Sequence, residues 1–210
     1  MFTKTLHANT LRAIELVAQV SYIQKAYLAG GTALALQLGH RISVDLDFFT
    51  QEPIDEQLVA QELSKLPDFK EENKAWRTVL GKVDKTKFSI FFLKYPLIDK
   101  LKSFNNIKIA GKKDIAAMKI HAISDRGAKR DFIDMYFLAK EFTLEEIFEF
   151  YNQKYGNIDE KRYILIKGLG YFGDAEIEEM PDMIVPVSWE EIKDFFKTET
   201  IRLAKSMLGI

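Results

Sequence analysis

Two aspartates separated by one leucine are the residues whose types and spacing most clearly indicate chemistry. Asp45 and Asp47 stand in the apolar, alternating stretch SVDLDFF, which is typical of a β-strand. In a strand both carboxylates would point to one face, with Cα atoms about 6.6 Å apart, while Leu46 faces the core. Two carboxylates this close repel each other, and a divalent cation relieves that repulsion. The pair predicts a Mg²⁺ (or Mn²⁺) site, and two acids on a solvated strand face are the alternative.

A glycine pair lies upstream, between a predicted strand at residues 25–29 and a predicted helix at residues 32–38. Gly30 and Gly31 let the backbone approach a ligand closely, and the N–H groups at a helix start favour phosphate. The hydroxyl of Thr32 would add one donor. A G-G-T turn by itself is weak evidence, but a strand, this turn, a helix and the D-x-D strand form a much rarer order. We therefore expect the turn to hold the phosphates of a nucleotide.

Polar residues between the glycines and the aspartates extend this candidate nucleotide site. Arg41 has a planar guanidinium that suits phosphate oxygens. Ser43 alternates with the two aspartates, so its hydroxyl would face the same way and bind a phosphate oxygen or a carboxylate. His40 is better explained as a loop histidine packed at a helix end.

A second group of charged residues interrupts the apolar pattern between residues 112 and 142. Lys119 stands among residues typical of a helix core, where its ammonium would be favoured by a carboxylate or a phosphate. Asp131 and Asp134 are three residues apart, so they share a face near the start of the next helix. Ordinary ion pairs of Lys119 or Arg130 with Asp131 would explain this group equally well.

The elements that position these residues follow from periodicity, turns and caps. Alternating segments at residues 77–83 and 87–93 flank a polar dipeptide at residues 84–85, which predicts a hairpin. Helical spacing dominates the later half of the chain. The sequence therefore predicts an α+β fold, with a mixed sheet flanked by helices at residues 1–110 and a helical part at residues 111–210 packed on it.

Composition limits the classes of function. The 210 residues carry a formal net charge of −1, so a polyanionic partner would need a local basic patch. The chain has no cysteine, which excludes disulfides, thiolate metal sites and a cysteine nucleophile. No signal peptide and no run of about 20 apolar residues is present, so we expect a cytoplasmic protein without a membrane partner.

The glycine pair, followed after thirteen residues by D-L-D, resembles the signature of the polymerase-β-like nucleotidyltransferase superfamily. The fuller text GGTALALQLGHRISVDLDFF is similar to one branch, the AbiEii/AbiGii-like toxins of type IV toxin–antitoxin (abortive infection) systems. The segment KKDIAAMKIHAISDRGAKRDF resembles a later motif of that family. The resemblance implies active-site roles for Lys119 and Asp131, and makes Arg126 and Arg130 further candidates to bind the nucleotide.

The resemblance implies a metal-dependent enzyme with a polymerase-β-like fold that moves a nucleotidyl group from a nucleoside triphosphate to an acceptor. For related toxins it implies an RNA acceptor, such as tRNA, and growth arrest relieved by an antitoxin that acts without stable binding. Transfer to a small molecule and an inactive binding protein of the same fold are the alternatives.

One departure from the superfamily pattern concerns the third carboxylate, which usually lies on a later strand. This chain offers Ser89 there, while Asp84 lies in the predicted turn and Asp99 lies past the strand. Either Asp131 substitutes for the missing acid, as a base for the attacking hydroxyl or as an orienter of Lys119, or the metal site is incomplete.

Overall fold

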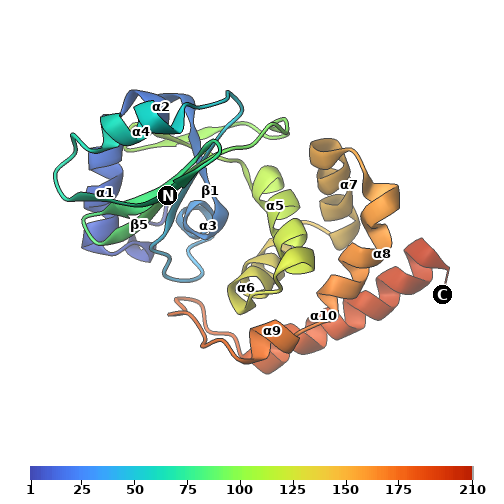
Figure 1. Cartoon of the computed structure of the whole chain (residues 1–210). Helices are drawn as coiled ribbons and strands as arrows, with labels where there is room; N and C mark the ends of the chain where they lie inside the picture. The colour runs from blue at the N-terminus through green and yellow to red at the C-terminus, as the bar shows by residue number, and fades with distance from the viewer. Residues whose placement is uncertain (210) are drawn as a thin grey trace. The chain divides into compact units, whose positions relative to one another are not determined.

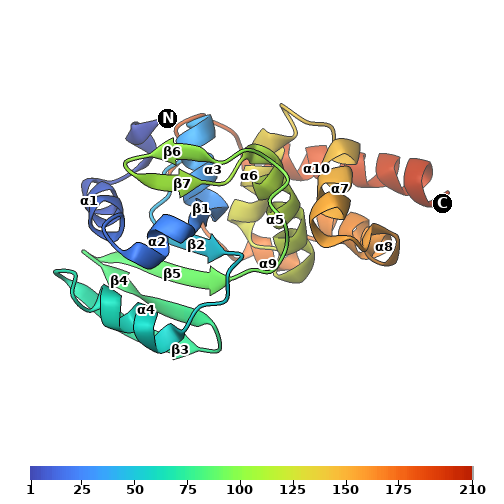
Figure 2. The same cartoon turned by 90° about the horizontal axis from the view of Figure 1, so that it is seen from above.

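A seven-stranded mixed β-sheet organises the first unit of the chain, Met1–Gly111. The computed structural model describes residues 1–209, and Figure 2 shows the strands in the order β3-β4-β5-β2-β1-β7-β6. Strand β2 runs parallel to β5 and antiparallel to β1, which in turn runs parallel to β7. The strands are β1 Tyr27–Ala29, β2 Leu46–Thr50, β3 Phe69–Ala75, β4 Thr78–Val83, β5 Thr86–Phe92, β6 Lys102–Phe104 and β7 Ile107–Ile109.

The two faces of this sheet differ in burial because side chains alternate along each strand. Phe48, Phe88 and Ile90 are at most 2% exposed and form part of the apolar core. Their strand neighbours Phe49 and Phe91 stack on each other at 5.4 Å between ring centroids and are only partly buried. The central strands therefore have one apolar, buried face and one face that is only partly buried.

Helices connect the strands of the first unit (Figure 1), and two of them begin or end as the sequence predicts. Helix α3 ends at Gly39, which adopts the left-handed conformation with φ of 71°. Helix α4 begins after Asp55, whose carboxylate accepts hydrogen bonds from the N–H groups of Gln57 and Leu58. The helical segments are η1 Thr3–Thr5, α1 Ala8–Val17, α2 Ser21–Lys25, α3 Gly30–Leu38 and α4 Glu56–Leu63.

The predicted hairpin is confirmed, whereas two strands were not predicted. Asp84 and Lys85 form the turn between β4 and β5, both with positive φ. Strand β3 escaped prediction because its middle residues are charged and exposed, so no apolar alternation marks it. Strand β6 has only three residues and no buried one, which leaves no pattern to read.

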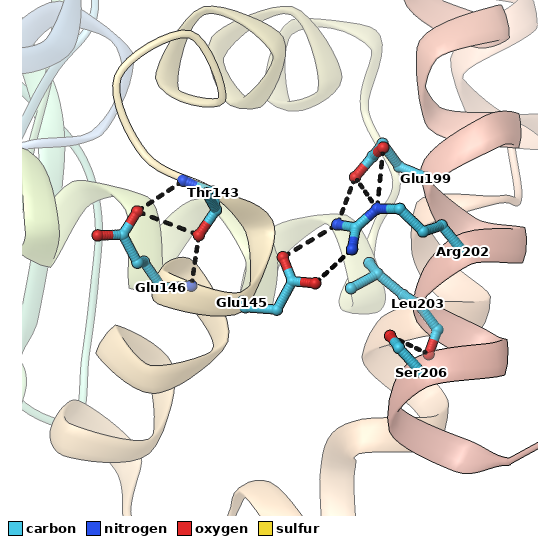
Figure 3. Close-up of polar contacts among 7 residues, drawn as sticks. All are labelled: Thr143, Glu145, Glu146, Glu199, Arg202, Leu203 and Ser206. Carbon is cyan, nitrogen blue, oxygen red and sulfur yellow. Dashed lines mark hydrogen bonds and ion pairs between the residues drawn. The ribbon is translucent and has the colours of Figure 1, made fainter.

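The second unit, Lys112–Ile210, is helical in its described part. Thr143 and Glu146 form a capping box at the start of α7 (Figure 3). Ser188 caps α10 through the Glu191 N–H, but the Glu191 carboxylate accepts from Tyr136 instead of closing a second box. The helices are α5 Lys112–Asp125, α6 Lys129–Leu138, α7 Leu144–Tyr155, α8 Ile158–Leu169, α9 Gly173–Glu176, α10 Trp189–Leu203 and a final π-helical turn, Ala204–Leu208.

The division of the chain into a transferase core at residues 1–110 and a helical part at residues 111–210 that packs on this core stays a prediction. None of the helices in residues 1–209 combines the length and apolarity needed to cross a membrane.

Candidate functional site

The aspartate pair does not lie on one strand, which corrects the geometry expected from alternation. Strand β2 begins at Leu46, so Asp47 belongs to it and Asp45 precedes it. The Asp45 carbonyl accepts a hydrogen bond from Thr32 Oγ1 at 2.5 Å, and the Ser43 N–H donates to the Thr5 carbonyl. These backbone groups form their hydrogen bonds with the Thr32 side chain and with η1, and not with a neighbouring strand. The expected spacing of about 6.6 Å assumed that both aspartates lie in one strand, and the structure places only Asp47 there.

Each carboxylate oxygen of Asp47 has a close neighbour. Ser89 Oγ, on the adjacent parallel strand, donates to Asp47 Oδ1 at 2.5 Å. Gly30 lies against the other oxygen, because a Cβ built on Gly30 would stand 3.2 Å from Asp47 Oδ2. Gly30 also has φ of +67°, a conformation that favours glycine. Glycine at position 30 thus allows the backbone before α3 to approach the Asp47 carboxylate.

Gly31 makes room for Arg41 in the same way. A Cβ on Gly31 would stand 2.3 Å from Arg41 Nη2 and 3.2 Å from Ser43 Oγ. The Arg41 guanidinium is buried, with the residue 4% exposed, and its Nη1 donates to the Ile42 carbonyl at 3.0 Å. The first N–H groups of a helix lack intrahelical partners and carry partial positive charge. The guanidinium and the start of α3 therefore place positive potential together, which favours a bound anion.

Thr32 has a structural role that the sequence did not indicate. Its residue is 1% exposed, and its hydroxyl bonds Ser43 Oγ at 2.9 Å besides donating to the Asp45 carbonyl. A hydroxyl has one proton, so Thr32 has none left for a phosphate in this arrangement. Thr32 instead ties the first turn of α3 to the segment that carries Asp45.

The oxygen-rich donors of the first unit fit Mg²⁺ as an ion shared with a substrate. Asp45 and Asp47 supply hard carboxylate oxygens, and Mg²⁺ is commonly held by one or two carboxylates together with substrate phosphates. Among residues 1–209 no group of three or more histidine, aspartate or glutamate side chains is arranged as a complete metal cage. The chain itself therefore offers a partial ligand set that substrate oxygens would complete.

The helical unit contains a buried charge cluster around Lys119. Its Nζ lies 2.7 Å from Asp131 Oδ1 and 2.5 Å from Asp134 Oδ2, and both carboxylate side chains are fully buried. Arg126 donates from Nε to Asp131 Oδ2 at 2.8 Å and from Nη2 to Oδ1 at 3.1 Å, while its own side chain is half exposed. Arg130 is exposed. The structure thus pairs Lys119 with Asp131, one of the ion pairs that the sequence suggested, and adds Arg126, expected at the nucleotide, and Asp134, to which the sequence analysis had given no functional role.

Asp131 stays ionised in this cluster. Burial raises the pKa of its carboxyl, but the Lys119 ammonium and the Arg126 guanidinium outweigh burial and lower it below the ordinary value. A carboxylate whose two oxygens already accept from two cations is a weak proton acceptor. The geometry thus favours Asp131 as the group that orients Lys119.

The third carboxylate has no counterpart next to Asp47. Ser89 is the direct register partner of Asp47 on β5. Asp84 sits in the hairpin turn and pairs with Arg12 at 3.6 Å. Asp99 lies against Gly111, where a Cβ would stand 2.3 Å from its Oδ2. Ser89, whose hydroxyl contacts Asp47, therefore lies on the strand where the resemblance implies a third acid.

Two aromatic residues that share the strand face of Asp47 were not identified from the sequence, because paired phenylalanines are most simply interpreted as core residues. Phe49 follows Asp47 by two residues and Phe91 follows Ser89 by two, so all four share a face. The alternation of strands β2 and β5 was the signal that could have separated them from Phe48 and Phe88.

Comparison with known proteins assigns most of the chain to the family that the sequence motifs indicated. The model of the family described as nucleotidyl transferase AbiEii toxin, type IV TA system, matches residues 14–110 and 96–203. An uncharacterised protein of Aquifex aeolicus (strain VF5) is 41% identical over 200 residues, which cover 92% of this chain and 95% of that protein.

Two solved structures share the fold. MenT4, a nucleotidyltransferase toxin from Mycobacterium tuberculosis H37Rv, is 16% identical with a TM-score of 0.60, covering 93% of this chain and 86% of that chain. JHP933 from Helicobacter pylori is 21% identical with a TM-score of 0.56, covering 97% and 92% of the two chains. The predicted α+β nucleotidyltransferase fold is confirmed.

Proposed function

Because the chain belongs to the AbiEii family of nucleotidyltransferase toxins from type IV toxin–antitoxin systems, we propose that it transfers a nucleotidyl group to RNA in a Mg²⁺-dependent reaction. Nucleotidyl transfer itself follows from the family, and a nucleoside triphosphate is the implied substrate. The metal, the acceptor and the residue roles are the proposal.

The observation that carries this proposal is the packing around the two glycines. Gly30 lies against Asp47 and Gly31 lies against Arg41, at the start of a nine-residue helix. A carboxylate that binds a cation and a guanidinium that binds an anion thus adjoin neighbouring residues of one turn. A metal–triphosphate has both charges, and this turn is complementary to both.

The residues of the first unit would bind the nucleotide. Asp45 and Asp47 would hold Mg²⁺, which supplies charge neutralisation at the phosphates when bound. The backbone N–H groups at Gly30 and Gly31, with Arg41, would bind the triphosphate oxygens. Thr32 and Ser43 act through the segment that carries Asp45, as positioning residues.

In the reaction, an acceptor hydroxyl oxygen forms a bond to the α-phosphorus, and the bond from that phosphorus to the β-bridging oxygen breaks. Pyrophosphate leaves, and the hydroxyl proton passes to solvent or to a nearby base. The family resemblance also implies an active-site role for Lys119, which lies in the helical unit, and that role is part of the proposal. Asp131 and Asp134 would hold the Lys119 ammonium in place, and Arg126 would keep Asp131 ionised.

The acceptor is proposed to be RNA, with the 3′ end of tRNA as its expected form. An antitoxin that relieves growth arrest without stable binding is the expected partner in the cell.

The proposal is tested with purified protein, Mg²⁺, each of the four radiolabelled nucleoside triphosphates and total RNA. We expect label in the RNA fraction from at least one nucleotide, and a loss of at least 100-fold in Asp45→Ala and in Asp47→Ala. Removal of Mg²⁺ with a chelator should abolish the transfer and added Mn²⁺ should restore it. Labelled RNA at equal levels in wild type and Asp45→Ala would sink the assignment of this site.

A further inference from the structure

The β3–β4 hairpin ends in an exposed tryptophan and a stacked arginine that the transfer chemistry does not use. Trp76 is 74% exposed. The Arg77 guanidinium carbon lies 4.7 Å from the centroid of the Trp76 ring and 4.8 Å from that of Phe92. The Trp76 and Phe92 rings meet edge to face, with centroids 6.3 Å apart. Trp76, Arg77 and Phe92 are called the hairpin-tip surface below.

The residue types in this turn are unfavourable for its backbone conformation. Trp76 and Arg77 are the two residues between β3 and β4, and Arg77 has φ of +51°. A positive φ at the second residue of a turn favours glycine or asparagine. The β6–β7 turn of the same sheet follows this preference with Asn105 and Asn106, whereas the β4–β5 turn departs from it at Lys85. Trp76 differs from the residues of both turns because its large apolar ring is exposed and is not part of the core. This exposure indicates that the side chain has a role other than folding.

The charge of the hairpin-tip surface suits a polyanion. Within residues 1–209 no carboxylate forms an ion pair with the Arg77 guanidinium. The carboxylate of Glu56 contacts only its backbone, accepting the Arg77 N–H at 3.3 Å. Lys94, two residues after Phe92, is exposed and adds a second cation beside the ring of Tyr95.

We infer that the hairpin-tip surface binds a single-stranded segment of the RNA acceptor, at nucleotides other than the one that reacts. Bases stack on exposed aromatic rings, and arginine and lysine bind the phosphates between them. The net charge of −1 excludes a global attraction for RNA, so a local surface of this kind is needed. The identity of the polymer rests on the proposed function.

The register of the sheet sets how this surface relates to Asp47. Phe92 pairs with Thr50, three residues or about 10 Å along β2 from the Asp47–Ser89 pair. Phe92 also alternates with Phe91 and therefore points to the opposite face from Asp47. The surface would thus affect the binding of RNA and not the bond-forming step.

The test measures the affinity of the full-length protein for a fluorescent, unstructured 12-nucleotide oligouridylate by anisotropy, at 50 and 200 mM salt. We expect Trp76→Ala to bind about 5- to 100-fold more weakly, because one stacked base is lost. Trp76→Phe should keep most of the affinity, because it keeps an aromatic ring on which a base can stack. Arg77→Ala should lower the slope of log affinity against log salt by about 0.7. Tyr163→Ala, another exposed aromatic, and Lys85→Ala, a cation of another turn, are the matched controls and should match wild type.

In the transfer assay the same Trp76 and Arg77 variants should raise KM for RNA and leave kcat within twofold. Equal oligouridylate affinity in wild type, Trp76→Ala and Arg77→Ala would overturn the inference. A protein partner would then be the alternative ligand of this surface. RNA binding that depends on Trp76 without any nucleotidyl transfer would support this surface while rejecting the proposed function. Equal losses in Tyr163→Ala and Trp76→Ala would also overturn it, because the binding would then be unspecific.

Discussion

At the scale of single residues, the carboxylate of Asp47 is held by the hydroxyl of Ser89 on the adjacent parallel strand. Ser89 Oγ donates to Asp47 Oδ1 at 2.5 Å, and Ser89 is 6% exposed. A hydrogen bond to an ionised group is shorter and stronger than one between neutral groups. Mutation of a group that orients a metal ligand typically costs about 10- to 100-fold in metal affinity or activity. Ser89 is therefore a positioning residue for Asp47 in the proposed mechanism.

We predict that Ser89→Ala weakens Mn²⁺ binding and lowers kcat/KM for transfer, each by about 10- to 100-fold. Without the hydroxyl, the Asp47 carboxylate loses the contact that fixes its orientation. Mn²⁺ binding is measured by electron paramagnetic resonance of the free ion, in parallel with the transfer assay.

Ser89→Thr keeps the hydroxyl on a β-branched side chain suited to a strand, so it should restore most of the binding. Ser64→Ala removes an exposed hydroxyl that bonds only its own helix and serves as the control. Unchanged Mn²⁺ affinity in Ser89→Ala would show that Asp47 needs no such support.

At the scale of elements, an arginine network joins helices α7 and α10 in the second unit (Figure 3). Arg202 binds both carboxylate oxygens of Glu145 on α7 and also contacts Glu199 on its own helix. These contacts raise the pKa of Arg202 through the hydrogen bonds to Glu145 and Glu199, and lower the pKa of Glu145. The side chains are almost half exposed, so water screens much of the attraction.

We predict that Arg202→Ala lowers the free energy of unfolding by about 1 kcal/mol, at the upper end for exposed pairs because the contact is bidentate and shared. For a chain of this size the melting temperature should fall by about 2–4 °C. Calorimetry or circular dichroism at low salt measures the change.

Lys197→Ala removes a cation of the same helix that has only an i,i+3 partner, Asp194, and should change the melting temperature by less than 1 °C. The difference between the two variants should shrink in 0.5 M salt, because screening weakens exposed pairs. A difference that is independent of salt would contradict an electrostatic role for Arg202.

At the scale of the whole molecule, ionised carboxylates couple folding to pH. Asp131, Glu145 and Glu176 all have pKa values lowered by neighbouring cations, and all three lie in the helical unit. Asp131 is the buried one, so its ionisation matters most for stability. A carboxyl with a lowered folded-state pKa adds stability at pH values above its unfolded pKa, and that stability is lost as pH falls.

We predict that the urea midpoint of the wild type is nearly constant from pH 7 to pH 5 and falls steeply between pH 4 and pH 3. The ordinary pKa of an aspartate, 3.8, sets the upper edge of that window. Urea unfolding followed by circular dichroism at each pH measures it.

Asp131→Asn should be less stable than wild type at pH 7, because the buried Lys119 then keeps only Asp134 of its two carboxylate partners and Arg126 loses its ionised partner. The same variant should show a shallower decline between pH 4 and pH 3. An equal decline in wild type and Asp131→Asn would assign the acid sensitivity to other carboxyls.

The sequence by itself determined the elements whose local signals are strong. Helix α3 between Gly30 and Gly39 and the Asp55 cap follow from the conformations that those residue types favour, and the β4–β5 hairpin follows from the alternating segments on either side of Asp84 and Lys85. The ordered glycine and aspartate motif also identified the family. These features are local, so residues near in the chain were sufficient to predict them.

Only the tertiary structure decided how the candidate residues meet. The start of β2 at Leu46, the contact of Ser89 with Asp47 and the inclusion of Asp134 in the Lys119 cluster depend on neighbours from other strands and helices. Periodicity gives the face on which a side chain lies, but not which side chain from another element opposes it. For the same reason the role of Thr32 as a tie to Asp45 became visible only when α3 and the segment before β2 were placed together.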